Sequence, residues 1–160
     1  QLQQGKTEEE AQEYLRQLFT HVPVQDKSAR ESLATFAGGK GDVLLAYENE
    51  SITAQQKGEK FEYVIPAETL LTENPAAVVT ESANPEKARE FINFLRTPEA
   101  QRIFSQKGYR SLLPEIQAEF TDTYPTPEKL FTIDDLGGWA DVTTKFFDPD
   151  NGIVALVQQQ

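Results

Sequence analysis

The chain contains no cysteine and a single histidine, His21. Without cysteine it can form neither a disulfide nor a thiolate metal site, although this absence is compatible with an oxidising compartment. A lone histidine lacks the second histidine or cysteine that a nucleophile–base pair or a transition-metal site needs. We interpret His21 as a surface group at the end of an amphipathic helix. These residues predict a protein that is not an enzyme and that holds no metal and no cofactor.

Long apolar runs are also missing. No run approaches the roughly 20 residues that a membrane-spanning helix needs. The amino-terminal sequence QLQQGKTEEE lacks the basic start and the apolar centre of a signal peptide, so we expect a mature, trimmed or partial form. The 160 residues, 38% of them hydrophobic, suffice for one core or two small lobes.

Positive charge is scarce, because 15 Lys and Arg stand against 26 Asp and Glu, which gives a formal net charge of -11. Nucleic acids and anionic membranes are bound mainly through contacts of Lys and Arg with phosphates, so this balance argues against both as partners. A small anion is not excluded. The N–H groups and the dipole at the start of a helix bind anions whatever the net charge of the surface.

One helix start has the sequence pattern for such an anion site. Ser28 is placed to cap a helix that begins at Ala29, and Glu31 would complete a Ser-x-x-Glu capping box. The glycine pair at 38–39 ends this helix, and residues 42–47 (DVLLAY) are predicted to form a buried strand.

The predicted strand brings an aromatic side chain toward the helix start. If it lies beside the helix, the backbone N–H groups of Ala29 and Arg30 come close to the ring of Tyr47. Such a cluster could hold an anion without any charge pairing.

Helical and extended patterns alternate in the first part of the chain. A capping box at Thr7 starts a helix that Pro23 stops, and a further helix follows from residues 48–50 to about Gly58. Residues 60–66 (KFEYVIP) alternate as a strand does. This order of elements predicts an α/β sheet with parallel strands.

The remainder of the chain breaks the alternation. The short extended runs 68–71 and 76–80 could form a hinge, and helices that begin at Pro85 and Pro98 form a predicted helical hairpin. The other expected elements are a helical turn at 115–120, an extended segment from Leu130, a helix over 139–147 and a short helix at 153–157.

Two acidic residues near the proposed site, Glu48 and Glu50, have two interpretations. As paired carboxylates they could serve as a general acid and base, which would require a substrate cleft. As structural groups they would bond to nearby backbone or to Arg30. Arg30 could itself point at a ligand, or bridge to Glu31, Glu48 or Glu50, and composition favours neither.

Several specific segments occur in a fixed order along the chain. They are GDVLLAYENE (41–50), FEYVIPAETLL (61–71), NPEKAREFINFLRTPEAQ (84–101), GYRS (108–111) and LFTIDDLGGW (130–139). Together they resemble the carboxy-terminal half of the periplasmic sulfate-binding proteins of ABC transporters. The resemblance extends over essentially all 160 residues.

The resemblance implies an α/β fold that is periplasmic-binding-protein type II-like and partial, an incomplete two-lobe fold. In that family, two lobes joined by a hinge close over a dehydrated sulfate that uncharged donors hold. Residues 1–70 with 130–160 would form an incomplete second, ligand-binding lobe, and residues 71–129 part of the first lobe beyond the hinge. The implied location is the periplasm. The implied partners are sulfate or thiosulfate, with molybdate and other tetrahedral oxyanions left open, and a membrane ABC permease for the full-length protein.

The resemblance also assigns site residues by position. The backbone N–H of Ala29 would be one sulfate donor, and Tyr47 stands where the family has a ligand-contacting tryptophan. A phenol O–H can donate to sulfate as an indole does, but it can also accept a hydrogen bond. The residues expected behind these donors are Ser28, Arg30, Glu48 and Asn49.

The family's other ligand groups, an early aspartate, a serine and a Ser-Gly-Gly helix start, have no match in this chain. We therefore expect a truncated chain that binds sulfate weakly or not at all. The alternative is an assembly fragment that self-associates as a swapped dimer without binding an anion. A hydrolase that uses Glu48 and Glu50 is the third hypothesis.

Overall fold

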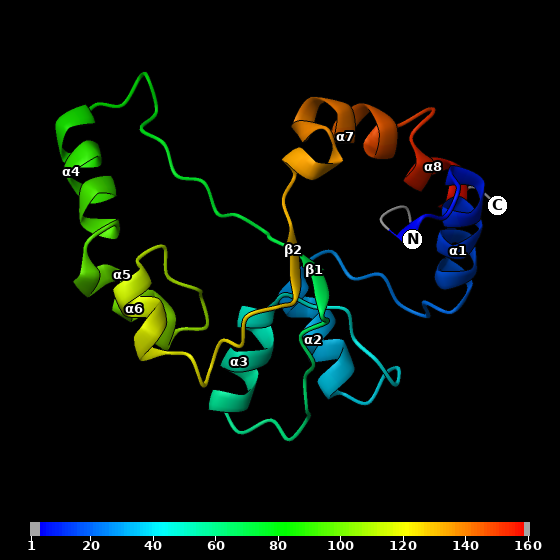
Figure 1. Cartoon of the computed structure of the whole chain (residues 1–160), viewed down its shortest axis with the longest axis horizontal. Coiled ribbons are helices and arrows are strands. Elements are labelled where there is room, and N and C mark those ends of the chain that lie inside the picture. Colours follow the sequence, from blue (N-terminus) through cyan, green and yellow to red (C-terminus); the bar gives the residue numbers. More distant parts are fainter. Residues whose placement is uncertain (1–3, 159–160) are drawn as a thin grey trace. The chain divides into compact units, whose positions relative to one another are not determined.

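The computed structural model describes residues 4–158 (Figure 1). The elements in chain order are α1 (Glu8–Thr20), α2 (Ala29–Ala37), α3 (Glu48–Gln56), β1 (Glu68–Leu70), α4 (Pro85–Leu95), α5 (Pro98–Gln106), α6 (Pro114–Glu119), β2 (Lys129–Phe131), the short 3-10 helix η2 (Asp134–Leu136), α7 (Gly138–Phe147) and α8 (Ile153–Gln158). None of these helices is both long and apolar enough to cross a membrane.

The chain forms two compact units. One is the continuous stretch Ser28–Leu130, and the other combines the chain up to Lys27 with the chain from Phe131 onward. The incomplete lobes expected from the resemblance, residues 1–70 with 130–160 and residues 71–129, stay a prediction. The outermost residues of those ranges, 1–3 and 159–160, lie outside the described residues.

The discontinuous unit is built from α1, η2, α7 and α8. Helix α8 packs against both α1 and α7, and Val142 and Val157 are buried there. The capping box predicted at Thr7 is confirmed, since the Thr7 hydroxyl accepts from the N–H of Glu10 and the Glu10 carboxylate accepts from the N–H of Thr7. An ion pair between Glu8 and Lys145 adds a polar link between α1 and α7.

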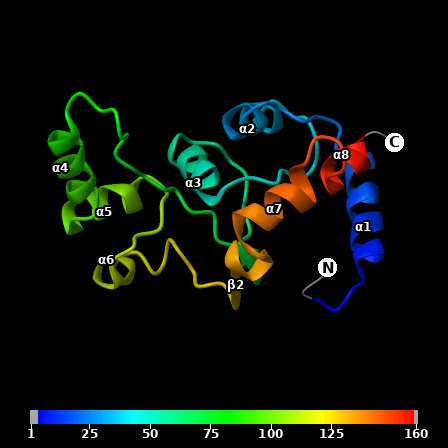
Figure 2. The same cartoon turned by 90° about the horizontal axis from the view of Figure 1, so that it is seen from above.

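The continuous unit contains α2 to α6 and β1, and in it α2 packs on α3, and α5 packs on both α4 and α6. Its buried apolar side chains include Ile52, Ala54, Ala100 and Ile116. The two helices predicted from Pro85 and Pro98 are confirmed as α4 and α5, which contact each other (Figure 2).

A buried glutamine organises the loop after α5. Gln101 is 5% exposed, and its side-chain oxygen accepts from the hydroxyl of Ser111 at 3.0 Å and from the N–H of Leu112 at 2.8 Å. Its side-chain N–H group donates to the carbonyl of Leu95 at 2.8 Å. Because a buried amide is costly unless its hydrogen bonds are made, this side chain fixes the path of the loop that carries residues 108–113.

Two of the predicted strands are wrong. Residues 42–47 and 60–66 are without a β-ladder, and the sheet found within residues 4–158 is the pair β1 and β2. Residues 42–47 are not buried either, because Val43 and Leu45 are 81% and 78% exposed. A strand needs a neighbour to take its backbone hydrogen bonds, and the described residues supply none at these positions.

Candidate anion-binding site

The first part of the candidate site is the start of α2. Ser28 has an extended backbone, with φ -146° and ψ 154°, and its hydroxyl accepts from the N–H of Glu31 at 3.2 Å. This is the Ser28 half of the predicted capping box. The first N–H groups of a helix have no carbonyl within the helix to bond. The N–H groups of Ala29 and Arg30 are therefore the donors that this helix start can offer to a ligand.

The side chain of Arg30 turns toward α3. It is 76% exposed, and its Nη2 atom lies 3.6 Å from Oε1 of Glu50, whose side chain is 11% exposed. Of the partners that the sequence left open for Arg30, the structure selects Glu50. An ion pair this long and this exposed on one side contributes little to stability, roughly 1 kcal/mol or less.

The second part of the site is the start of α3. Tyr47 immediately precedes the helix with φ -72° and ψ 146°, and it makes no capping hydrogen bond through its side chain. Its carbonyl accepts from the N–H groups of Glu50 at 3.1 Å and Ser51 at 3.5 Å, which close the first turn. Tyr47 is 53% exposed, so its side chain lies at the surface beside this turn.

Helices α2 and α3 bring these two parts together. The helices pack against each other (Figures 1 and 2). The Arg30–Glu50 contact joins their first turns. The candidate donors of Ala29 and Tyr47 thus belong to neighbouring helix starts within the continuous unit. A helix start is suited to an anion because it presents the positive end of the helix dipole, and here two such starts belong to helices in contact.

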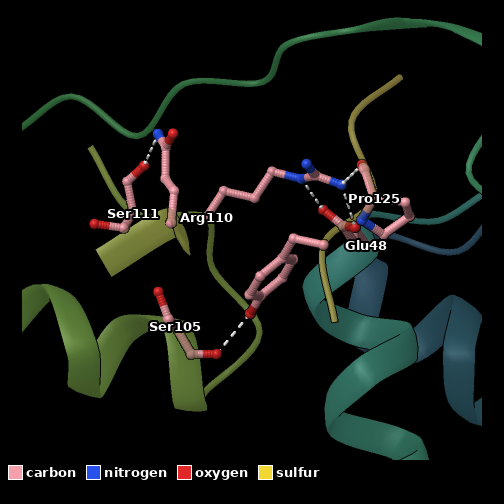
Figure 3. Close-up of polar contacts among 7 residues, drawn as sticks. Glu48, Ser105, Arg110, Ser111 and Pro125 are labelled. Atoms are coloured by element: carbon pink, nitrogen blue, oxygen red, sulfur yellow. Dashed lines mark hydrogen bonds and ion pairs between the residues drawn. The ribbon is translucent and has the colours of Figure 1, made fainter. Parts of the chain in front are cut away.

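Glu48 is held by a residue that the site analysis of the sequence missed. Nε of Arg110 donates to Oε2 of Glu48 at 2.7 Å, and Nη2 of Arg110 donates to Oε1 at 2.8 Å (Figure 3). The side chains are 31% and 18% exposed, respectively. The sequence signal was present in the GYRS segment, but nothing local marks Arg110 as a neighbour of a residue 62 positions away.

Asn49, expected behind the donors, contacts the segment that follows α5. Its side-chain N–H group donates to the hydroxyl of Tyr109 at 3.4 Å, and Gly108 lies against its backbone. Glu48 and Asn49 therefore support the start of α3 from the side of α5. The structure thus joins Arg30 to Glu50, Glu48 to Arg110 and Asn49 to Tyr109, while the Ser28 hydroxyl caps its own helix.

Besides burial, the charge of Glu48 contributes to the raised pKa of two tyrosines, Tyr124 and Tyr63. Burial raises the pKa of Tyr124 to about 12, and the nearby carboxylate of Glu48 adds to the rise while Arg110 opposes it. Burial, followed by the charge of Glu48, also raises the pKa of Tyr63. No group of three or more His, Cys, Asp or Glu that could hold a metal ion occurs in the part of the chain that the structure describes.

Comparison with known proteins identifies the family to which this chain is similar. Residues 4–110 match the family model described as bacterial extracellular solute-binding protein. A sulfate-binding protein of Synechococcus elongatus is 44% identical over 98% of this chain and 46% of its own length. A thiosulfate-binding protein of Escherichia coli is 33% identical over 89% of this chain and 43% of its own length. The chain spans about half the length of the curated relatives it matches.

A solved structure gives the same relation. The sulfate-binding protein SubI from Mycobacterium tuberculosis is 43% identical, with a TM-score of 0.75 over 81% of this chain and 45% of that chain. This likeness confirms the predicted fold class, a partial α/β fold of the periplasmic-binding-protein type II-like class. The chain resembles sulfate-binding proteins in sequence and in structure, and it belongs to the family of bacterial extracellular solute-binding proteins.

Proposed function

We propose that this chain carries part of a sulfate site, with the backbone N–H of Ala29 and the hydroxyl of Tyr47 as donors. The observation that carries this proposal is the pairing of two helix starts, α2 and α3, joined by the Arg30–Glu50 contact. Sulfate is a fully ionised dianion that offers only acceptors, so free N–H and O–H groups at positive helix ends suit it. The relatives named as sulfate-binding and thiosulfate-binding proteins support the same class of ligand.

The proposed role is that of a binding component of an ABC uptake system, located in the periplasm and working with a membrane permease in the full-length protein. The acidic residues support binding over catalysis, because Glu48 is engaged by Arg110 and Glu50 by Arg30. Unchanged sulfate binding in a Glu48→Gln, Glu50→Gln double variant would argue against any essential role for these carboxylates. We also keep the assignment of residues 1–70 with 130–160 to the ligand-binding lobe as a proposal.

The test follows the amide signals of Ala29 and Arg30 by NMR while sodium sulfate is added at constant ionic strength. Shifts should saturate at these amides with weak affinity, because the donors matched in this chain are only part of the family's set. An Ala29→Pro variant removes one N–H donor at the first helical position, where proline is well tolerated. The extended backbone of Ser28 already suits a following proline.

The matched control is Ala29→Ser, which keeps the backbone N–H. Ala29→Pro should weaken the sulfate response at Arg30 by several fold, and Ala29→Ser should retain it. A flat response in the unmodified chain, or equal responses in both variants, would reject Ala29 as a donor. Micromolar or tighter binding by the unmodified chain would instead contradict the expected weakness.

A second function is favoured by one observation. Val43, Leu45 and Val64 are 81%, 78% and 84% exposed on extended segments without a β-ladder. We infer, as the alternative, that this chain is an assembly fragment in which these segments pair with a second copy in a swapped dimer that binds no anion. Solution mass separates the two, since a stable dimer without sulfate affinity favours assembly.

A further inference from the structure

We propose that Arg110 is a positioning residue for the anion site, which fixes the start of α3 and neutralises the charge of Glu48 beside Tyr47. This inference rests on the proposed function for its ligand. The way in which Arg110 would act is argued from the contacts that hold α3. Those contacts join α3 to residues 106–110 and involve none of the proposed donor groups.

Helix α3 lies along the segment that follows the body of α5, residues 106–110, which we term the support segment. The side-chain N–H of Gln56 donates to the carbonyl of Gln106 at 3.1 Å. The hydroxyl of Thr53 lies 3.5 Å from the carbonyl of Lys107. Asn49, Thr53 and Gln56 recur at intervals of four and three positions, so one side of α3 faces the support segment along its length.

The middle of the support segment touches the backbone of α3. Gly108 has φ +99°, and a Cβ placed on it would lie 3.0 Å from Cα and 3.1 Å from the carbonyl oxygen of Asn49. A side chain at this position would be too close to the helix backbone. The close approach sets the distance between α3 and the support segment, and Arg110 comes two residues later.

Arg110 is itself fixed on several sides. Besides its two bonds to Glu48, its Nη2 atom donates to the carbonyl of Pro125 at 2.9 Å (Figure 3). Its guanidinium lies 5.3 Å from the centre of the Tyr124 ring, and the hydroxyl of Tyr124 donates to the carbonyl of Ser105 at 2.6 Å. A guanidinium with this many partners has one orientation, so it can transmit a fixed position to the carboxylate.

The fixed carboxylate belongs to the first residue of α3. Glu48 directly follows Tyr47, whose side chain provides no cap of its own for the helix. Holding Glu48 therefore holds the backbone that carries the Tyr47 hydroxyl. The same pair removes a free negative charge from a helix start that is proposed to face a dianion. Without Arg110, the carboxylate would both move and repel the ligand.

The experiment compares Arg110→Gln, Arg110→Lys and the double variant Glu48→Gln, Arg110→Gln. The matched control is Arg102→Gln, because Arg102 makes the same two-bond pair with Glu119 at 2.7 and 2.6 Å but joins α5 to α6. Two readouts are taken on the full chain. One is the sodium sulfate titration of the Ala29 and Arg30 amides, and the other is hydrogen exchange at the Ser51 amide without sulfate.

Arg110→Gln should weaken sulfate binding by about fivefold to tenfold, less than a fully buried pair would, since both partners retain some solvent contact. Arg110→Lys keeps the charge but not the paired bonds, so it should weaken binding by less. The double variant should recover part of the loss, because the unpaired carboxylate is gone. Exchange at Ser51 should quicken in Arg110→Gln and stay unchanged in Arg102→Gln.

The outcomes separate this inference from the proposed function. If the unmodified chain shows no response to sulfate, the proposed function is overturned. This result is obtained before any variant is compared. If sulfate binds but Ser51 exchange and sulfate affinity are both unchanged in Arg110→Gln, the positioning role is overturned. An equal loss in Arg102→Gln would also overturn it, because the effect would then be a general weakening of the unit.

Discussion

At the scale of single residues, the molecule contrasts two arginine–glutamate pairs of nearly identical bond geometry. Arg102 and Glu119 are 42% and 43% exposed, whereas Arg110 and Glu48 are 31% and 18% exposed and stand beside an aromatic ring. Solvent screens the first pair on both sides. Removal of Arg110 should therefore affect α3, because the largely buried carboxylate of Glu48 would lose its partner.

Tyr124 provides a prediction about pH. Its pKa is raised to about 12, chiefly by burial and then by Glu48, whereas an unfolded tyrosine titrates near 10. The folded protein thus keeps the proton at pH values where the unfolded chain releases it. The contribution of Tyr124 to stability is complete below pH of about 10 and declines as the pH rises toward 12.

Urea denaturation at a series of alkaline pH values measures this decline. The unmodified chain should lose stability over that interval more steeply than Tyr124→Phe, which has no proton to release there. Glu48→Gln should lower the pKa of Tyr124, as followed by tyrosinate absorbance, because one cause of the rise is removed. Parallel stability curves for the unmodified chain and Tyr124→Phe would contradict the prediction.

At the scale of elements, the two glycines that follow α3 and α5 offer a matched comparison. Gly58 and Gly108 have φ of +97° and +99°, but a Cβ on Gly58 would meet nothing within 4 Å. Alanine at Gly58 should cost only the backbone strain, roughly 1 kcal/mol. Alanine at Gly108 should cost about 1–3 kcal/mol more, because it also pushes α3 from the support segment.

The unfolding midpoints of Gly58→Ala and Gly108→Ala in urea check this difference. Hydrogen exchange along α3 should quicken in Gly108→Ala from its first turn. Equal midpoints in the two variants would mean that α3 shifts freely, and that the close approach to Asn49 does not fix its place.

Helix ends could be predicted from the sequence because the groups that make them are close along the chain. The hydroxyls of Thr7 and Ser28 each accept from an N–H group three residues on, as their sequence patterns predict. The strands at 42–47 and 60–66 could not be judged in this way, since a strand depends on remote partners. The role of Arg110 could not be predicted for the same reason, because its partner Glu48 lies 62 positions away in the sequence.

At the scale of the whole molecule, the chain spans about half of its relatives and leaves large apolar side chains in contact with solvent. Val43, Leu45 and Val64 stand on extended segments of the kind that pair with another strand. We predict association that increases with protein concentration. A Val43→Lys, Val64→Lys variant should shift the mass in analytical ultracentrifugation toward the monomer, because lysine opposes pairing at strand edges.

The control for this experiment is Ala140→Lys, which adds positive charge on the exposed surface of α7. It should associate as the unmodified chain does. A monomer at all concentrations in the unmodified chain would remove the support for the assembly alternative, and sulfate binding would remain as the proposal to test.

The division of the chain into units has one more consequence, for how the site is encoded. The helix starts of α2 and α3, the support segment and Arg110 all fall within the uninterrupted stretch Ser28–Leu130. The other unit draws on both flanks of that stretch, with α8 packed on α1. A deletion from either flank would remove part of that second unit. The continuous segment 28–130 would still contain every group assigned to the anion.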